Sequence, residues 1–125
     1  MRTKDVFVIF LLLIMLSACS RPQKFTREAW SYSDGLNFPS RDNILQDLLA
    51  SHPLKGLNHY QLQQLLGTPQ QSDNSKFIYI YEIENTAYTY NPKKKPVHIK
   101  NLLVYLSKDS IVTNTRVFEQ TKKVK

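Results

Sequence analysis

The strongest hydrophobic pattern in the chain is an unbroken apolar run near the N-terminus. Eleven apolar residues follow one another from Val6 to Leu16, and two basic residues precede them. A membrane-spanning helix needs about 20 apolar residues to cross about 30 Å of hydrocarbon, so this run is too short to span a bilayer. The small residues Ser17 and Ala18 come directly after it. The pattern predicts a signal peptide over residues 1–18 that is removed from the mature protein.

Two later segments have the apolar spacing of short helices. Residues 41–50 place Ile and Leu at positions i, i+1, i+4 and i+5, and Ser40 is their predicted N-cap. Residues 59–66 follow Asn58, which is predicted to form a capping box with the glutamine three positions on, and Gly67 is predicted to end this helix. Helices this short are marginal in water, so we expect their apolar faces to pack on another layer.

That layer is predicted from three runs rich in β-branched and aromatic residues, namely 77–84, 102–106 and 111–118. The last two flank a polar turn and form a predicted hairpin. The first two are joined by a 14-residue loop from Asn85 to His98, a length typical of a functional or mobile segment. We therefore expect an α+β domain over residues 41–120, in which two short helices pack on a three-stranded antiparallel sheet (αα-βββ), followed by a basic tail over residues 121–125.

The segment between the signal peptide and this domain, residues 19–40, reads as a tether. It lacks periodicity and contains two prolines and a glycine. It also carries aromatic rings that are unusual in a solvated linker, at Phe25, Trp30, Tyr32 and Phe38. Two interpretations are open: these rings pack on the protein's own domain, or they form a strip that binds a partner.

The residues Leu16-Ser17-Ala18-Cys19 resemble the bacterial lipobox. This resemblance implies that the thiol of Cys19 is lipidated, as in palmitate-bearing lipoproteins, and that two or three acyl chains anchor the mature protein to a membrane. The alternative is an ordinary secretory peptide cut near Ala18, but Cys19 is the only cysteine, and a lone thiol has no disulfide partner outside the cytosol. Ser20 after the cysteine favours the periplasmic side of the cell outer membrane over the inner membrane.

Charge narrows the choice of partner. The chain has 17 Lys+Arg and 10 Asp+Glu, a formal net charge of +7. In the cell envelope a basic surface meets anionic lipid headgroups and acidic proteins, and nucleic acid is not an expected partner. The basic stretch in the long loop could instead serve only to keep the loop soluble and to protect strand edges. The candidate residues for binding a partner or lipid are Lys93, Lys94, Lys95, Tyr88, Tyr90 and Trp30.

Patterns for catalysis or metal binding are missing from the sequence. The three histidines, His52, His59 and His98, have no metal-ligand spacing, and no Gly-x-Ser-x-Gly elbow or phosphate-binding glycine loop occurs. Glu82 and Glu84 stand two positions apart and are expected on one face of a strand, as a solvated edge rather than an acid/base pair. The sequence therefore predicts a protein that is not an enzyme and needs no cofactor or metal.

The order of these elements, together with several short motifs in residues 54–115, resembles the small outer-membrane lipoproteins of the SmpA/OmlA (BamE) family. The motifs are Gly56-Leu57-Asn58, Leu66-Gly67-Thr68-Pro69, Ser72-Asp73, Leu102-Leu103-Val104-Tyr105-Leu106 and Val112-Thr113-Asn114. The resemblance implies the αα-βββ fold and a place on the periplasmic side of the outer membrane. We expect a lipid-anchored, non-catalytic protein-binding module; the alternatives are an accessory factor in outer-membrane β-barrel assembly and an inhibitor or modulator of an envelope enzyme.

Overall fold

A computed structural model describes residues 23–88 and 92–123 of the chain. The predicted signal peptide, Cys19 and Tyr90 lie outside these residues. Among the helices of the described part, none is long and apolar enough to cross a membrane.

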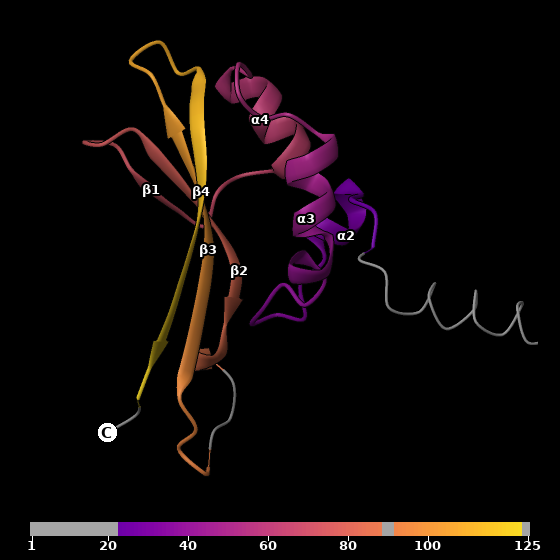
Figure 1. Ribbon diagram of the computed structural model, residues 1–125, viewed down its shortest axis with the longest axis vertical. Helices are drawn as coiled ribbons and strands as arrows, with labels where there is room; N and C mark the ends of the chain where they lie inside the picture. The colour runs from indigo at the N-terminus through magenta and orange to yellow at the C-terminus, as the bar shows by residue number, and fades with distance from the viewer. Residues whose placement is uncertain (1–22, 89–91, 124–125) are drawn as a thin grey trace, which may run out of the picture.

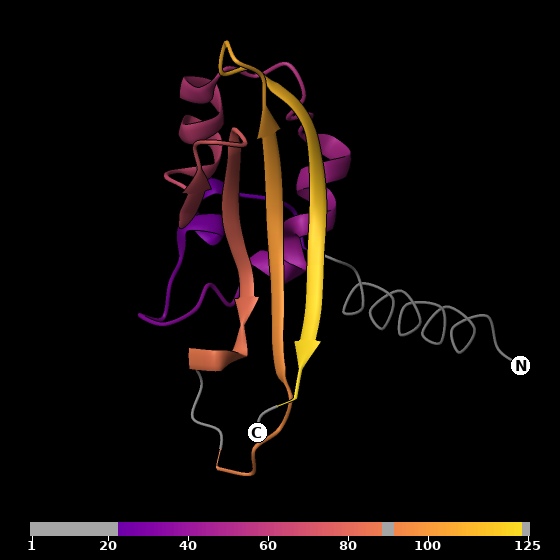
Figure 2. The same ribbon diagram turned by 90° about the vertical axis from the view of Figure 1, so that its left-hand side faces the viewer.

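The described residues form two layers, one of helices and one of strands. The strands make a single antiparallel sheet in the order β1-β2-β3-β4. Figures 1 and 2 show the three α-helices on one side of this sheet, so that its other face is left uncovered. The elements are α2 (Arg27–Ser31), α3 (Arg41–Ser51), α4 (His59–Leu66), β1 (Gln71–Asp73), β2 (Ile78–Asn85), the 3-10 helix η1 (Thr86–Tyr88), β3 (Val97–Leu106) and β4 (Val112–Lys122).

The predicted α+β class is confirmed, whereas the prediction of three strands is wrong. The fourth strand is β1, whose three polar residues pair with Ile78–Ile80 at the edge of the sheet. Polar residues have low strand propensity, so this strand exists because of its pairing with β2 and not because of its own sequence. The additional helix α2 has only five residues, too few to show a periodic pattern.

Strand β3 and the edge strand β4 are both longer than predicted. β3 begins at Val97 rather than Leu102, and β4 continues to Lys122, so the first residues of the predicted tail belong to the sheet. Pairing of Val97 with Lys122 extends the hairpin at the end away from its turn. The loop between β2 and β3 is correspondingly shorter than the predicted 14 residues, and its first part is the 3-10 helix η1.

The predicted ends of α4 are confirmed, whereas the predicted N-cap of α3 is confirmed only in part. Asn58 and Gln61 form the predicted capping box, with the Asn58 Oδ1 accepting from the Gln61 backbone N–H at 2.9 Å. Gly67 ends the helix with a positive φ of 75°. Ser40 stands at the N-cap position of α3, but its side chain makes no capping hydrogen bond. The first backbone N–H of α3 is instead bonded to the Phe38 carbonyl.

The hydrophobic core lies between the layers and includes part of the predicted tether. Trp30 on α2 is fully buried, and its indole N–H donates to the Leu66 carbonyl at 3.0 Å. Phe25 is buried beside it, with ring centroids 6.0 Å apart. Of the two interpretations of this segment, the structure supports packing on the protein's own domain. The buried apolar residues are Phe25, Trp30, Ile44, Leu45, Leu48, Leu54, Leu62, Leu66, Tyr81, Ile83, Leu102, Val104 and Val112.

One charged side chain, Arg41, is enclosed by this core and is only 2% exposed. Its Nε donates to the Trp30 carbonyl at 2.8 Å, and its Nη1 donates to the Gln70 Oε1 and to the Glu82 carbonyl. The guanidinium also stacks over the Phe38 ring at 3.6 Å. Burial lowers the pKa of Arg41 to about 10. Because this value is still well above neutral pH, the group stays charged. Arg41 therefore joins the N-terminal segment, α3 and β2 at one point.

Candidate functional site

The most extensive feature available to a ligand is the face of the sheet that the helices leave uncovered. Side chains alternate between the two faces of a strand, and the buried residues of β2 and β3 all point toward the helices. The alternate residues of β2 and β3 therefore lie on the uncovered face, together with Phe118 of β4, which pairs with Asn101. Apolar side chains on this face remain half-buried. These are Ile78, Ile80, Ile99, Leu103, Tyr105 and Phe118.

A shallow groove of about 370 Å³ crosses one half of this face. Apolar side chains line it together with polar ones, most of which are amides. Three of the amides, Gln71, Asn101 and Gln120, make no side-chain hydrogen bond with any other residue of the described part. Apolar side chains and free hydrogen-bonding groups thus lie side by side in the groove, with Asn101 between Glu82 and Phe118 in the strand register. Its lining is Gln70, Gln71, Ile80, Glu82, Asn85, Ile99, Asn101, Phe118 and Gln120.

A β-bulge separates the two glutamates that were expected to share a face. The pairing register of β2 and β3 shifts between Glu82 and Glu84. Because a bulge inserts one extra residue, it moves the following side chain to the other face of the sheet. Glu82 consequently lines the groove on the uncovered face, whereas Glu84 lines a pocket on the helix side. The predicted placement of both carboxylates on one face is wrong.

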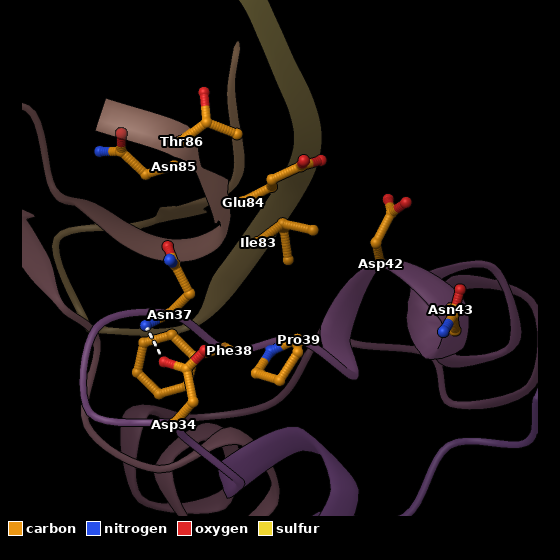
Figure 3. A pocket seen from close by; sticks show the side chains of 10 residues that line it. All are labelled: Asp34, Asn37, Phe38, Pro39, Asp42, Asn43, Ile83, Glu84, Asn85 and Thr86. Atoms are coloured by element: carbon orange, nitrogen blue, oxygen red, sulfur yellow. Dashed lines mark hydrogen bonds between the residues drawn. The ribbon is translucent and has the colours of Figure 1, made fainter. Parts of the chain in front are cut away.

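The pocket on the helix side holds about 340 Å³ and is shown in Figure 3. It lies between the loop before α3, the first turn of α3 and the end of β2, and three carboxylates line it: Asp34, Asp42 and Glu84. Asp34 accepts hydrogen bonds from the backbone N–H groups of Asn37 and Leu36, and these bonds lower the pKa of Asp34. The pocket therefore has acidic walls in a chain whose net charge is positive.

Two of these carboxylates are already paired with basic side chains of β3. The Lys100 Nζ donates to Asp42 at 2.7 Å, which ties β3 to the start of α3. The His98 Nδ1 lies 3.1 Å from the Glu84 Oε2, and its Nε2 lies 2.6 Å from the Glu119 Oε1. The hydrogen bond to Glu119, with that to Glu84, raises the pKa of His98. These ion pairs join α3, β2, β3 and β4, so the charges act as links within the fold.

Of the residues predicted to bind a partner, the structure describes the side chains of three loop lysines and Trp30, and Trp30 lies apart from the lysines, in the core. Lys93, Lys94 and Lys95 lie exposed in the loop that joins η1 to β3, at the same end of the sheet as Lys122 (Figure 2). Tyr88 ends η1, but its side chain is outside the described part, as are Tyr90 and Cys19.

Trp30 is placed where a partner cannot reach its ring. It is 0% exposed, and the rings of Phe25 and Tyr81 pack against it. The prediction that Trp30 contacts a partner is therefore wrong, and the residue belongs to the hydrophobic core. A ring of this size stabilises the fold most when it is fully removed from water.

The uncovered face was not identified from the sequence, although the signal for it is there. At the start of β2 the apolar residues follow one another without a break from Ile78 to Tyr81, which makes both faces of the strand apolar. In Leu102–Leu106 the same holds. A strand with one solvated face would instead alternate.

The described residues contain no group of three or more His, Cys, Asp or Glu side chains that could hold a metal ion. Comparison with known proteins adds no assignment: no protein-family model, curated protein or solved structure matches this chain.

Proposed function

We propose that this protein is a lipid-anchored lipoprotein of the cell envelope that acts as a non-catalytic protein-binding module, with the uncovered face of its sheet as the binding surface. The observation that carries the proposal is that face itself: half-buried apolar side chains of three strands, with free amide groups beside them. Protein interfaces likewise combine apolar contacts with hydrogen-bonding groups. A continuous apolar surface on a folded domain is also typical of interaction sites.

The proposed anchor would hold this domain close to the membrane. Only five residues separate Cys19 from Phe25, and Phe25 is packed in the core with its backbone N–H bonded to Asp47 at 2.7 Å. Six steps of extended chain reach at most about 20 Å. A lipidated Cys19 would therefore confine the binding surface to the neighbourhood of the bilayer.

The anchor is tested by metabolic labelling with radioactive or alkyne-tagged palmitate. The wild-type protein should be labelled and recovered with membranes, and the Cys19→Ser variant should be neither. Equal labelling of both proteins would refute lipidation at this residue.

The binding surface is tested by photo-crosslinking in intact cells. A benzophenone amino acid replaces Tyr105 on the uncovered face or, as the matched control, Tyr60 on α4, which is 70% exposed on the helix side. We expect a protein crosslink from position 105 and none from position 60. Barrel-assembly proteins among the products would favour the accessory role suggested by the family resemblance, and crosslinks from position 60 alone would refute the proposed surface.

A further inference from the structure

The two edges of the sheet differ in how their backbone hydrogen-bonding groups are used. At the first edge, β1 covers Ile78–Ile80 of β2. Beyond β1, the Glu82 N–H donates to the Gln70 side chain at 2.9 Å, and the Glu82 carbonyl accepts from Arg41 at 2.7 Å. Side chains thus satisfy the backbone where strand pairing stops. The edge of β2 is thus closed to an additional strand, and of the described strands only the three-residue β1 has an outer side here.

At the other edge, only the beginning of β4 is closed. The Val112 N–H donates to the Leu57 carbonyl, and the Val112 carbonyl accepts from the Gly56 N–H, both at 2.8 Å. No hydrogen bond joins the outer edge of β4 from Thr115 to Thr121 to any other described residue. Natural proteins usually protect long edge strands, because unpaired backbone groups are a template for another strand.

The orientation of the outer groups follows from the register. The Leu106 N–H donates to the Phe77 carbonyl, and the His98 N–H donates to Thr86, so even-numbered residues of β3 turn their backbone groups toward β2. Odd-numbered residues of β3 therefore bond to β4, where their partners are the even-numbered residues. The backbone groups that face outward on β4 belong to the four residues Thr115, Val117, Glu119 and Thr121, spread over about 20 Å.

Side chains along this edge indicate the charge of an incoming strand. Arg116 and Lys122 share the uncovered face and form no ion pair within the described part of the chain. Glu119 points to the other face, where His98 already pairs with it. Phe118 lies between the two cations on their face. A second copy would bring the same two cations to the shared edge, which favours a partner of opposite charge.

We propose that the outer edge of β4, from Thr115 to Thr121, binds an extended acidic segment of a partner protein by strand addition. This inference rests on the proposed protein-binding function and specifies its mode. Main-chain hydrogen bonds to the four outward residues supply affinity, as in other cases of β-augmentation. In an antiparallel arrangement, carboxylates at positions k and k+6 face Lys122 and Arg116, and an apolar residue at k+4 faces Phe118.

The test uses the protein purified from membranes in detergent and a fluorescent ten-residue peptide with this pattern of carboxylates. The control peptide has lysine in place of both acidic residues. Val117→Pro removes an outward N–H without breaking the ladder to β3, and Val117→Thr is the matched variant that keeps the N–H. We expect saturable binding of the acidic peptide, a loss of about tenfold in Val117→Pro, and little change in Val117→Thr.

Amide hydrogen exchange on the wild-type complex provides a second readout that does not depend on a proline variant folding. Strand addition should slow exchange at Val117 and Glu119, while Arg116 and Phe118, already bonded to β3, change little. The inference would be overturned by a lack of saturable binding or by equal affinity for the lysine peptide. It would also be overturned by slowed exchange only at amides of β2 and β3, or by dimerisation through β4 in place of peptide binding. If Val117→Pro binds the acidic peptide as tightly as wild type while the crosslink from position 105 persists, strand addition fails and the protein-binding function remains.

Discussion

Replacing Arg41 with alanine should destabilise the fold more than any surface substitution. The guanidinium makes three hydrogen bonds, to the Trp30 carbonyl, the Gln70 side chain and the Glu82 carbonyl. Its removal leaves two carbonyls of the α2 and β2 segments without this donor. Each acceptor that stays buried without a partner costs about 1–3 kcal/mol. The side chain also stacks on Phe38 and Trp30, and that packing is lost as well.

Part of this loss is recovered, because the native protein no longer has to desolvate a charge. That cost is visible in the pKa of Arg41, which burial lowers to about 10. We expect a net decrease of about 3 kcal/mol in the free energy of unfolding, a large share of the 5–15 kcal/mol typical of a domain. For a domain of this size the melting temperature should fall by roughly 10–20 °C.

The assay is thermal and urea unfolding followed by intrinsic fluorescence. Trp30 is the only tryptophan and is fully buried, so its emission reports directly on this part of the core. Arg27→Ala, at an exposed position of α2, is the control and should change stability by less than about 0.5 kcal/mol. Arg41→Lys keeps the charge but not the fork of donors, so it should recover only a small part of the loss. A decrease below about 1 kcal/mol in Arg41→Ala would refute the view that Arg41 joins the two layers.

Three further predictions concern the cap, the histidine and the basic loop. Asn58→Ala should lower stability by about 1 kcal/mol in urea unfolding, because both bonds of the capping box are lost; Asn74→Ala, in an exposed turn, is the control. The raised pKa of His98 means that its contribution to stability is complete below the unfolded pKa of about 6.5 and is lost as pH rises through the folded value. The stability difference between wild type and His98→Gln should therefore shrink as pH rises above about 6.5, and a constant difference would contradict this coupling. Exchanging Lys93, Lys94 and Lys95 for Gln should weaken binding to anionic vesicles by about 1 kcal/mol per lysine, whereas exchanging Lys76 and Lys108 at the other end of the sheet should not; equal effects would assign the binding to net charge alone.

What could be predicted from the sequence is governed by how local the determining interactions are. The capping box at Asn58 and the glycine stop at Gly67 are formed within one helix, and both were identified correctly. The strand at Gln71–Asp73 depends on β2, and the five-residue α2 depends on burial of Trp30, so neither has a signal of its own. Short elements of this kind are stabilised by tertiary packing, which a single sequence does not display.

The candidate site shows the same division. Lysines in a loop are exposed whatever the fold, so Lys93 and Lys94 were placed correctly. The burial of Arg41 was not foreseeable, because an arginine in the first turn of a helix is ordinarily solvated and its three acceptors come from distant parts of the chain. The bulge after Glu82 was likewise hidden, and one inserted residue was enough to move Glu84 to the helix side.

The position of Phe25 connects the proposed anchor to the proposed binding surfaces. Its ring packs 5.1 Å from His52 at the end of α3, and its N–H is bonded to Asp47 of the same helix, so the chain toward Cys19 leaves from the helix layer. The uncovered face lies on the opposite side of the domain, beyond the sheet (Figure 1). A lipid on Cys19 would therefore be connected to the helix side of the domain. It would leave both the uncovered sheet face and the outer edge of β4 accessible to a partner. The short connection that would keep the domain at the membrane thus does not require the proposed binding surfaces to be buried against lipid.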